Sequence, residues 1–66
     1  MKYRAYNENE IFAEAETLES CIAAMLEKVS DDDIIDWKIW IDRMDDEGEW
    51  LESFNECDVY DMAVNA

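Results

Sequence analysis

The sequence predicts an α+β domain, a small antiparallel sheet (ββαββ) with one amphipathic helix on one face and a short C-terminal appendage. Apolar residues recur at helical spacing between positions 18 and 29, and short alternating segments that carry aromatic residues lie on both sides of that stretch. The chain has no Pro, one Gly and no linker-like stretch. Its 66 residues suffice for one domain, so 1–66 is predicted to be a single acidic domain.

The first two strands are predicted to form a hairpin. Residues 2–6 alternate in polarity and carry two Tyr, residues 7–10 form a polar turn, and residues 11–15 alternate again. This alternation places two sets of side chains on opposite sides of the sheet, Ile11, Ala13 and Ala15 on one side and Phe12, Glu14 and Glu16 on the other.

One helix is predicted after this hairpin. Its apolar stripe at i, i+3, i+4, i+7, i+8 and i+11 consists of Leu18, Cys21, Ile22, Met25, Leu26 and Val29. Thr17 is a suitable N-cap, and Glu19 in the first turn and Lys28 in the last turn suit the helix dipole. Residues 30–33, Ser-Asp-Asp-Asp, either end the helix or cap a further short turn through Ile35.

A second hairpin is predicted from a strand at residues 37–43, a turn at residues 44–48 and a returning strand at residues 49–55. Gly48 suits the positive φ that such turns need. We expect Arg43 to pair with Glu49, because a register slipped by one residue would mix the two faces. The predicted apolar face carries Trp37, Ile39 and Ile41, with Ile41 opposite Leu51 and Ile39 opposite Ser53.

The other face of this hairpin is predicted to show aromatic residues among carboxylates. Its expected cross-strand pairs are Trp40 with Glu52, Asp42 with Trp50, and Lys38 with Phe54. Trp and Tyr are favoured anchors in interface hot spots, and one helix cannot cover both faces of a sheet. Trp40 and Trp50 are therefore either a contact surface or are covered by the tail, in which Val59, Met62 and Ala63 could line a short helix.

The charge is the outstanding feature of the composition. Nineteen Asp and Glu face five Lys and Arg with no His, which gives a formal net charge of −14. Such a surface repels nucleic acid and anionic membranes, and it attracts basic proteins and speeds their association. Because a domain of this size has a thin core, the chain is expected as a monomer or a homodimer.

The cysteines and the N-terminus predict a cytoplasmic protein with reduced thiols. The N-terminal MKYRAYNENE has no apolar signal segment, and no stretch approaches 18 apolar residues. Thiols stay reduced in the cytoplasm, and Cys21 lies on the apolar helix face as a small core residue. A disulfide between Cys21 and Cys57 is the alternative.

No motif predicts catalysis, a metal or a cofactor. Without His, ordinary catalytic triads and HExxH zinc sites are excluded, and two distant Cys make no zinc knuckle. Asp45-Asp46-Glu47-Gly48 faintly resembles a calcium loop, but Gly48 at loop position 6 puts Arg43 and Phe54 where carboxylates belong. We therefore predict that the chain is no enzyme and acts by binding a partner.

The charge density predicts the kind of partner. A domain of this length is expected to be roughly 28 Å across, and that length of B-DNA carries about 16 phosphate charges. The formal charge of −14 is close to this value, so a basic DNA-binding protein could release its counterions on this chain as on DNA. The predicted partner-binding residues are Asp31, Asp32, Asp33, Asp36, Trp40, Asp42, Asp45, Asp46, Glu47, Glu49, Trp50 and Glu52.

In size, charge and the Asp31–Asp33 and Asp45–Glu49 segments, the chain resembles small phage-encoded anti-CRISPR and anti-restriction DNA mimics. The resemblance is compositional and carries over no individual residue. It implies an inhibitor that occupies the DNA- or PAM-binding surface of a CRISPR effector in the host bacterial cytoplasm. Two other interpretations stay open: an antitoxin-like or regulatory module that neutralises a basic protein without mimicking DNA, and an acidic halophilic subunit that folds only in molar salt.

Overall fold

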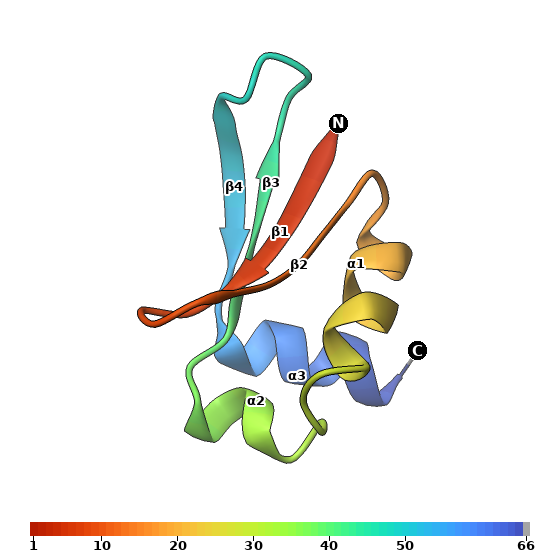
Figure 1. Cartoon of the computed structure of the whole chain (residues 1–66), viewed down its shortest axis with the longest axis vertical. Coiled ribbons are helices and arrows are strands. Elements are labelled where there is room, and N and C mark those ends of the chain that lie inside the picture. The colour runs from red at the N-terminus through yellow and green to blue at the C-terminus, as the bar shows by residue number, and fades with distance from the viewer. Residues whose placement is uncertain (66) are drawn as a thin grey trace.

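The computed structural model describes residues 1–65, which form four strands and three helices (Figure 1). The elements in chain order are β1 (Lys2–Tyr6), β2 (Ile11–Ala15), α1 (Leu18–Leu26), α2 (Asp33–Asp36), β3 (Trp40–Met44), β4 (Trp50–Phe54) and α3 (Glu56–Val64). The strands make one antiparallel sheet in the order β2-β1-β3-β4. The predicted α+β class and ββαββ arrangement are confirmed, and the two stretches left open by the sequence, the short turn through Ile35 and the tail, form α2 and α3.

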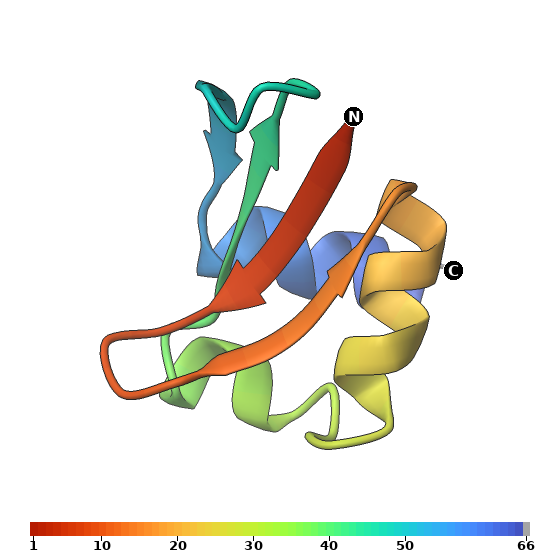
Figure 2. The ribbon, with the colours of Figure 1, turned by 45° about the horizontal axis from the view of Figure 1, so that its top comes forward.

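The helices lie on one side of the sheet. In Figure 2, α3 passes behind the strands and α1 lies close to β2. Helix α1 contacts β1 and β2, whereas α3 contacts β3, β4, α1 and α2. Among the described residues no element covers the opposite side of the sheet, which we call the open face.

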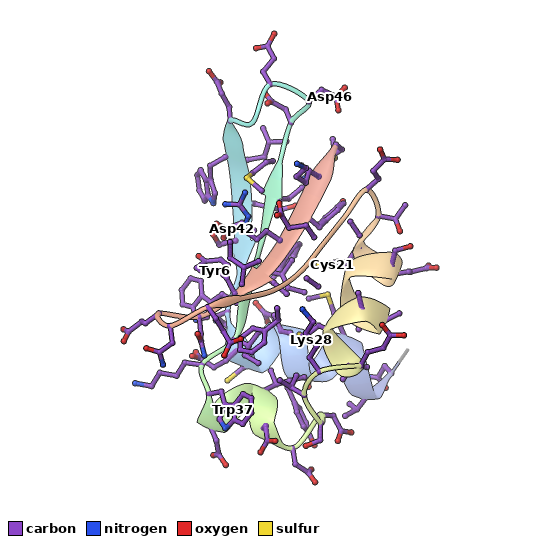
Figure 3. The ribbon with its side chains drawn as sticks, viewed as in Figure 1. Tyr6, Cys21, Lys28, Trp37, Asp42 and Asp46 are labelled. Atoms are coloured by element: carbon purple, nitrogen blue, oxygen red, sulfur yellow. The ribbon has the colours of Figure 1, made fainter. Side chains whose placement is uncertain are left out.

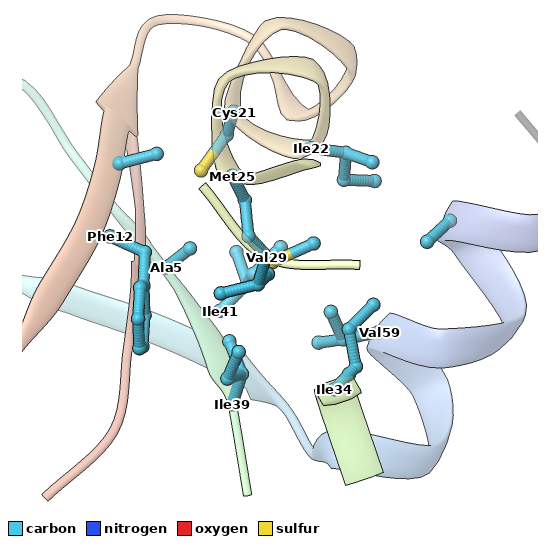
Figure 4. Packing of buried hydrophobic residues seen from close by; sticks show 12 residues of the cluster. Ala5, Phe12, Cys21, Ile22, Met25, Val29, Ile34, Ile39, Ile41 and Val59 are labelled. Atoms are coloured by element: carbon cyan, nitrogen blue, oxygen red, sulfur yellow. The ribbon is translucent and has the colours of Figure 1, made fainter. Parts of the chain in front are cut away.

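The core is one cluster of 12 buried residues between the sheet and the helices (Figure 4). Its largest fully buried side chains are Met25, Ile34, Ile39, Ile41, Val59 and Cys21. The predicted helical stripe is confirmed in part: Cys21, Ile22 and Met25 are buried on α1, Leu18 and Leu26 are partly buried, and Val29 is buried beyond the end of the helix. The tail does form a helix, α3, which buries Val59 and Ala63 and has Asn55 as its N-cap.

The N-terminal cap of α1 is as predicted and its C-terminal end is not. Thr17 Oγ1 accepts a hydrogen bond from the Ser20 N–H at 3.1 Å, and Glu19 lies in the first turn. The helix ends at Leu26 with Glu27 as its C-cap, so Lys28 lies beyond the last turn. Val29 lies in the connection between α1 and α2 and is buried in the core.

The strand predicted to start at Trp37 starts at Trp40, because α2 ends in a tight hydrogen-bonded turn there. The Lys38 N–H donates to the Ile35 carbonyl at 3.2 Å and the Ile39 N–H to the Ile34 carbonyl at 3.1 Å. This 5→2 and 6→1 pattern is a Schellman motif, with buried Ile34 and Ile39 as its apolar contact. Trp37, predicted in the core, is 45% exposed. Its ring stacks on Phe12 with centroids 6.2 Å apart.

The Schellman motif predicts an unusual response to substitution at Lys38, whose φ is 54°. Glycine is the residue preferred at this position because a Cβ in the left-handed region is strained by about 1–2 kcal/mol. After allowing for the unfolded-state entropy of glycine, we expect Lys38→Gly to leave stability unchanged or raise it by up to about 1 kcal/mol. Lys38→Val should lower it by about 1 kcal/mol or more. Urea unfolding measures both, and a destabilised glycine variant would contradict this explanation.

A β-bulge in β2 changes which of its side chains face the core, compared with the faces that strict alternation predicts. Tyr6 pairs with Ile11 and Ala5 with Ala13, so Phe12 is the extra residue opposite this step of β1. Phe12 and Ala13 are consequently both buried, whereas Ile11 is 51% exposed. Strict alternation of the side chains fails here because the bulge turns Phe12 toward the core.

The β3–β4 register also differs from the predicted one. Ile41 pairs with Phe54, Asp42 with Ser53, Arg43 with Glu52 and Met44 with Trp50. Met44 belongs to β3 and is buried, so the five-residue turn is 45–49 rather than 44–48. Asp45 Oδ1 accepts the Glu47 and Glu49 N–H groups, each at 2.9 Å, and Gly48 has the expected positive φ of 87°. These bonds fix the shifted turn, and Leu51 is left at a bulge.

Candidate functional site

The open face brings together aromatic residues from three strands. Ala5 pairs with Ile41, and both side chains are buried on the helix side of the sheet. Because side chains alternate along a strand, their neighbours in β1 and β3 point to the open face. The residues of the open face used below are Arg4 and Tyr6 of β1, Trp40 and Asp42 of β3, and Trp50 and Ser53 of β4.

A chain of hydrogen bonds orders the centre of this face. Trp50 Nε1 donates to Ser53 Oγ at 2.8 Å, and Ser53 Oγ donates to Asp42 Oδ1 at 2.6 Å. The Tyr6 hydroxyl donates to the same Oδ1 at 3.1 Å, and Figure 3 shows Tyr6 beside Asp42. The Trp50 indole is therefore held in place although the residue is 62% exposed. An exposed and pre-ordered indole is suited to contacting a partner.

Burial, and then the neighbouring Asp42 carboxylate, raise the pKa of Tyr6 above its usual 10.0. The folded state therefore favours the neutral phenol, which can keep donating to Asp42. Burial likewise raises the pKa of Cys21 from 9.0 to about 11.

These two shifts predict alkaline destabilisation. A raised folded-state pKa stabilises the fold fully below the unfolded-state pKa, and this contribution is lost as the pH rises through the folded-state value. We expect the free energy of unfolding to be flat with respect to Cys21 up to about pH 9 and to fall toward pH 11, with Tyr6 adding to the loss above pH 10. Urea unfolding at pH 8 and pH 11 measures this, and greater stability at pH 11 would be the contrary result.

Most cations of the sheet are neutralised by neighbouring carboxylates. Lys2 Nζ lies 3.8 Å from Glu14 Oε2, and Arg4 Nη2 lies 3.3 Å from the same oxygen. On the helix side, Arg43 Nε lies 3.2 Å from Glu52 Oε1, within ion-pair distance although the N–H is not aligned for a hydrogen bond. Within residues 1–65, Lys28 and Lys38 form no ion pair. The sheet centre is thus close to neutral, and the excess of negative charge lies around it.

Eleven of the twelve predicted partner-binding residues divide into three places, and Glu52 lies apart from them. Asp45, Asp46, Glu47 and Glu49 form the turn between β3 and β4, which we call the acidic turn. Asp31, Asp32, Asp33 and Asp36 lie in and before α2, which Figure 1 shows at the other end of the 32 Å long axis. Trp40, Asp42 and Trp50 lie between them on the open face. Asp42 is opposite Ser53 rather than Trp50, and Glu52 is on the helix side rather than opposite Trp40.

Some of these carboxylates accept hydrogen bonds that stabilise the turns in which they lie. Asp45 accepts the two backbone N–H groups that close the acidic turn, and Asp33 accepts the Ser30 hydroxyl at 3.2 Å. The N-terminal ammonium of Met1 pairs with Asp46 and lowers the pKa of that carboxyl group. Glu47 and Glu49 are exposed, which makes them the better choice for testing the charge of the turn.

Sequence reasoning missed three residues of this surface, Tyr6, Ser53 and Glu56. Tyr6 and Ser53 hold Asp42, and Glu56 Oε2 accepts a hydrogen bond from Trp40 Nε1 at 3.3 Å. The predicted register places Ser53 opposite Ile39 on the apolar face, whereas its observed pairing with Asp42 places it on the open face. Glu56 carries no signal in the sequence, since it reaches Trp40 only through the turn from β4 into α3.

The two cysteines are free, which excludes the alternative of a Cys21–Cys57 disulfide. Cys21 is buried on the core-facing side of α1, and Cys57 is exposed in the first turn of α3. We expect an aromatic disulfide reagent at pH 8 to titrate one thiol at once and the second only on unfolding in urea. Cys57→Ser should remove the fast phase and leave the slow one. Two equally fast thiols would contradict the burial of Cys21.

Two further observations bear on function. Among residues 1–65, no helix has the length and apolar composition needed to cross a bilayer, and no group of three or more His, Cys, Asp or Glu is arranged to hold a metal ion. Neither the protein-family models nor the curated proteins nor the solved structures give a match.

Proposed function

We propose that this protein is a non-catalytic inhibitor of a bacterial defence nuclease complex of the anti-CRISPR type. It binds the basic DNA- or PAM-recognition surface of a CRISPR effector by DNA-like charge mimicry and blocks target DNA. The host bacterial cytoplasm is the compartment in which this occurs. A restriction enzyme is the second candidate partner.

The observation that carries the proposal is the spread of acidic groups along the long axis. The acidic turn and the Asp31–Asp36 segment mark opposite ends of a molecule 32 Å long. B-DNA of that length carries about 19 phosphate charges. The chain has 19 acidic residues and a net charge of −14, and three of its five cations pair with carboxylates of the sheet. A protein groove that binds duplex DNA therefore meets, on this chain, a negative charge similar to that of B-DNA over a similar length.

The open face adds exposed aromatic residues that can give binding specificity, which the negative charge alone does not provide. Charged rims mainly accelerate association, whereas buried aromatic anchors slow dissociation. Trp50 and Trp40 are 62% and 38% exposed and stand between the two acidic ends. In this proposal the carboxylates steer the protein to basic surfaces in general, and the aromatic residues select one of them.

The test uses purified CRISPR effector complexes and restriction enzymes as a panel, each with its labelled target duplex. We expect the full chain to prevent duplex binding by at least one member at low salt, and excess duplex to displace the bound chain. No inhibition across the panel would count against the proposal.

The rival, an antitoxin-like or regulatory module, is favoured by the exposed Trp residues, since DNA presents no such side chains on its surface. It predicts tight binding to a small basic protein from a bacterial lysate and no release by duplex. The halophilic alternative predicts that circular dichroism detects folding only in molar salt.

A further inference from the structure

An open hollow of about 730 Å³ lies where the open face meets the start of α3. Tyr6 and Trp40 provide aromatic walls, and Ile35, 43% exposed, adds an apolar side. Glu8 and Glu56 bring carboxylates to the same hollow, and Lys38 lies at it as well. Its volume falls within the roughly 300–1,000 Å³ of ordinary ligand pockets.

From this arrangement we infer that the hollow receives an arginine side chain of the partner. A guanidinium stacks on an indole or phenol face and pairs with a carboxylate at its edge, and both groups are present. Glu56 is already placed for this role, because its Oε2 accepts the Trp40 Nε1 hydrogen bond and leaves Oε1 for a second donor. The two carboxylates and Lys38 give the hollow a formal charge of about −1, which an arginine neutralises.

The net charge of the chain and the planar shape of a guanidinium favour arginine over the other groups that could occupy the hollow. A nucleic-acid base also stacks on Trp, but a polyanion is repelled by a chain of net charge −14. A second copy carries the same charge and is repelled equally. Lysine is attracted by the carboxylates, but its compact, strongly hydrated ammonium neither stacks like a planar guanidinium nor donates in a fork. This inference rests on the proposed function, since it names the side chain by which a basic partner is recognised.

The test compares nona-arginine with nona-lysine as probes of the isotope-labelled full chain at low salt. The three Trp give three indole N–H signals in a proton–nitrogen correlation spectrum. We expect nona-arginine to bind about two- to fivefold more tightly than nona-lysine, the range expected for an exposed cation–π contact. The Trp40 signal should move more than the signals of Trp37 and Trp50.

Two matched variants distinguish binding of arginine in the hollow from attraction to the net negative charge of the chain. Glu56→Gln removes the charge but keeps an acceptor for Trp40, and it should abolish most of the arginine preference. Asp58→Asn makes the same change in the same turn of α3 outside the hollow and should keep the preference. Nona-arginine should also slow alkylation of Cys57, which lies at the hollow, more than nona-lysine does.

Equal affinities for the two peptides, binding of neither, an unmoved Trp40 signal, or a preference unchanged in Glu56→Gln would each overturn the inference. None of these results determines whether a DNA duplex displaces the chain from a nuclease complex, which a separate competition experiment measures. Failure of that displacement with an intact arginine preference would instead point to a basic partner that is not occupied by DNA.

Discussion

Reversing two charges of the acidic turn, Glu47→Lys with Glu49→Lys, is expected to weaken binding to the proposed nuclease partner about 100-fold. Both side chains are exposed, and neither supplies a side-chain hydrogen bond that closes the turn, which depends on Asp45 and Gly48. The fold should therefore survive. Two Lys would face a basic surface, and like charges brought together at an interface oppose association by several kcal/mol. Competition binding at fixed salt measures the change.

The control changes the net charge equally on the helix side. Glu27→Lys with Asp61→Lys replaces two exposed carboxylates at the end of α1 and in the last turn of α3, where Lys suits the helix dipole. We expect this pair to weaken binding less than tenfold. Equal losses for the two double variants would mean that net charge alone governs binding, and the assignment of the acidic turn would be wrong.

The second large effect concerns stability, at Ile41 in the centre of the sheet. Ile41 is fully buried and pairs with Ala5 and Phe54 on the neighbouring strands. Ile41→Ala should lower the free energy of unfolding by about 2–5 kcal/mol, the usual range for a buried isoleucine. A 66-residue domain has only about 3–10 kcal/mol in total. The variant should thus be partly or fully unfolded at 37 °C.

Ile11→Ala is the matched control, because Ile11 is 51% exposed on edge strand β2. Its effect should stay within about 0.5 kcal/mol. Urea unfolding measures both variants, with a changed midpoint and an unchanged slope as the sign of a true stability difference. Similar losses at Ile41 and Ile11 would contradict the described core.

The elements that the sequence predicted well are those whose signal is local. The spacing of Cys21, Ile22 and Met25 identifies the buried face of α1, and Thr17 marks its start. The errors are at bulges and at turns closed by backbone bonds. Phe12 faces the core only because β2 contains one residue more than β1 at that step.

The candidate site could be predicted only in part for the same reason. Alternation along the strands predicts Trp40 and Trp50 on the same face of the sheet, and the structure places both there, exposed rather than covered by the tail. Their hydrogen-bonding partners Ser53 and Glu56 depend on the β3–β4 register and on the turn into α3, neither of which alternation encodes. The separation of Asp31–Asp36 from the acidic turn depends on tertiary structure, so charge counting alone cannot give it.

The central claim is that this chain takes the place of DNA on a basic protein surface. The most direct measurement is competition between the full chain and a target duplex for a purified nuclease complex that the chain inhibits, repeated from about 50 to 200 mM salt. We expect mutually exclusive binding, with an affinity for the chain that falls steeply and linearly on a log–log plot against salt, as for a DNA ligand. Simultaneous binding of chain and duplex, or an affinity that does not change with salt, would contradict the claim.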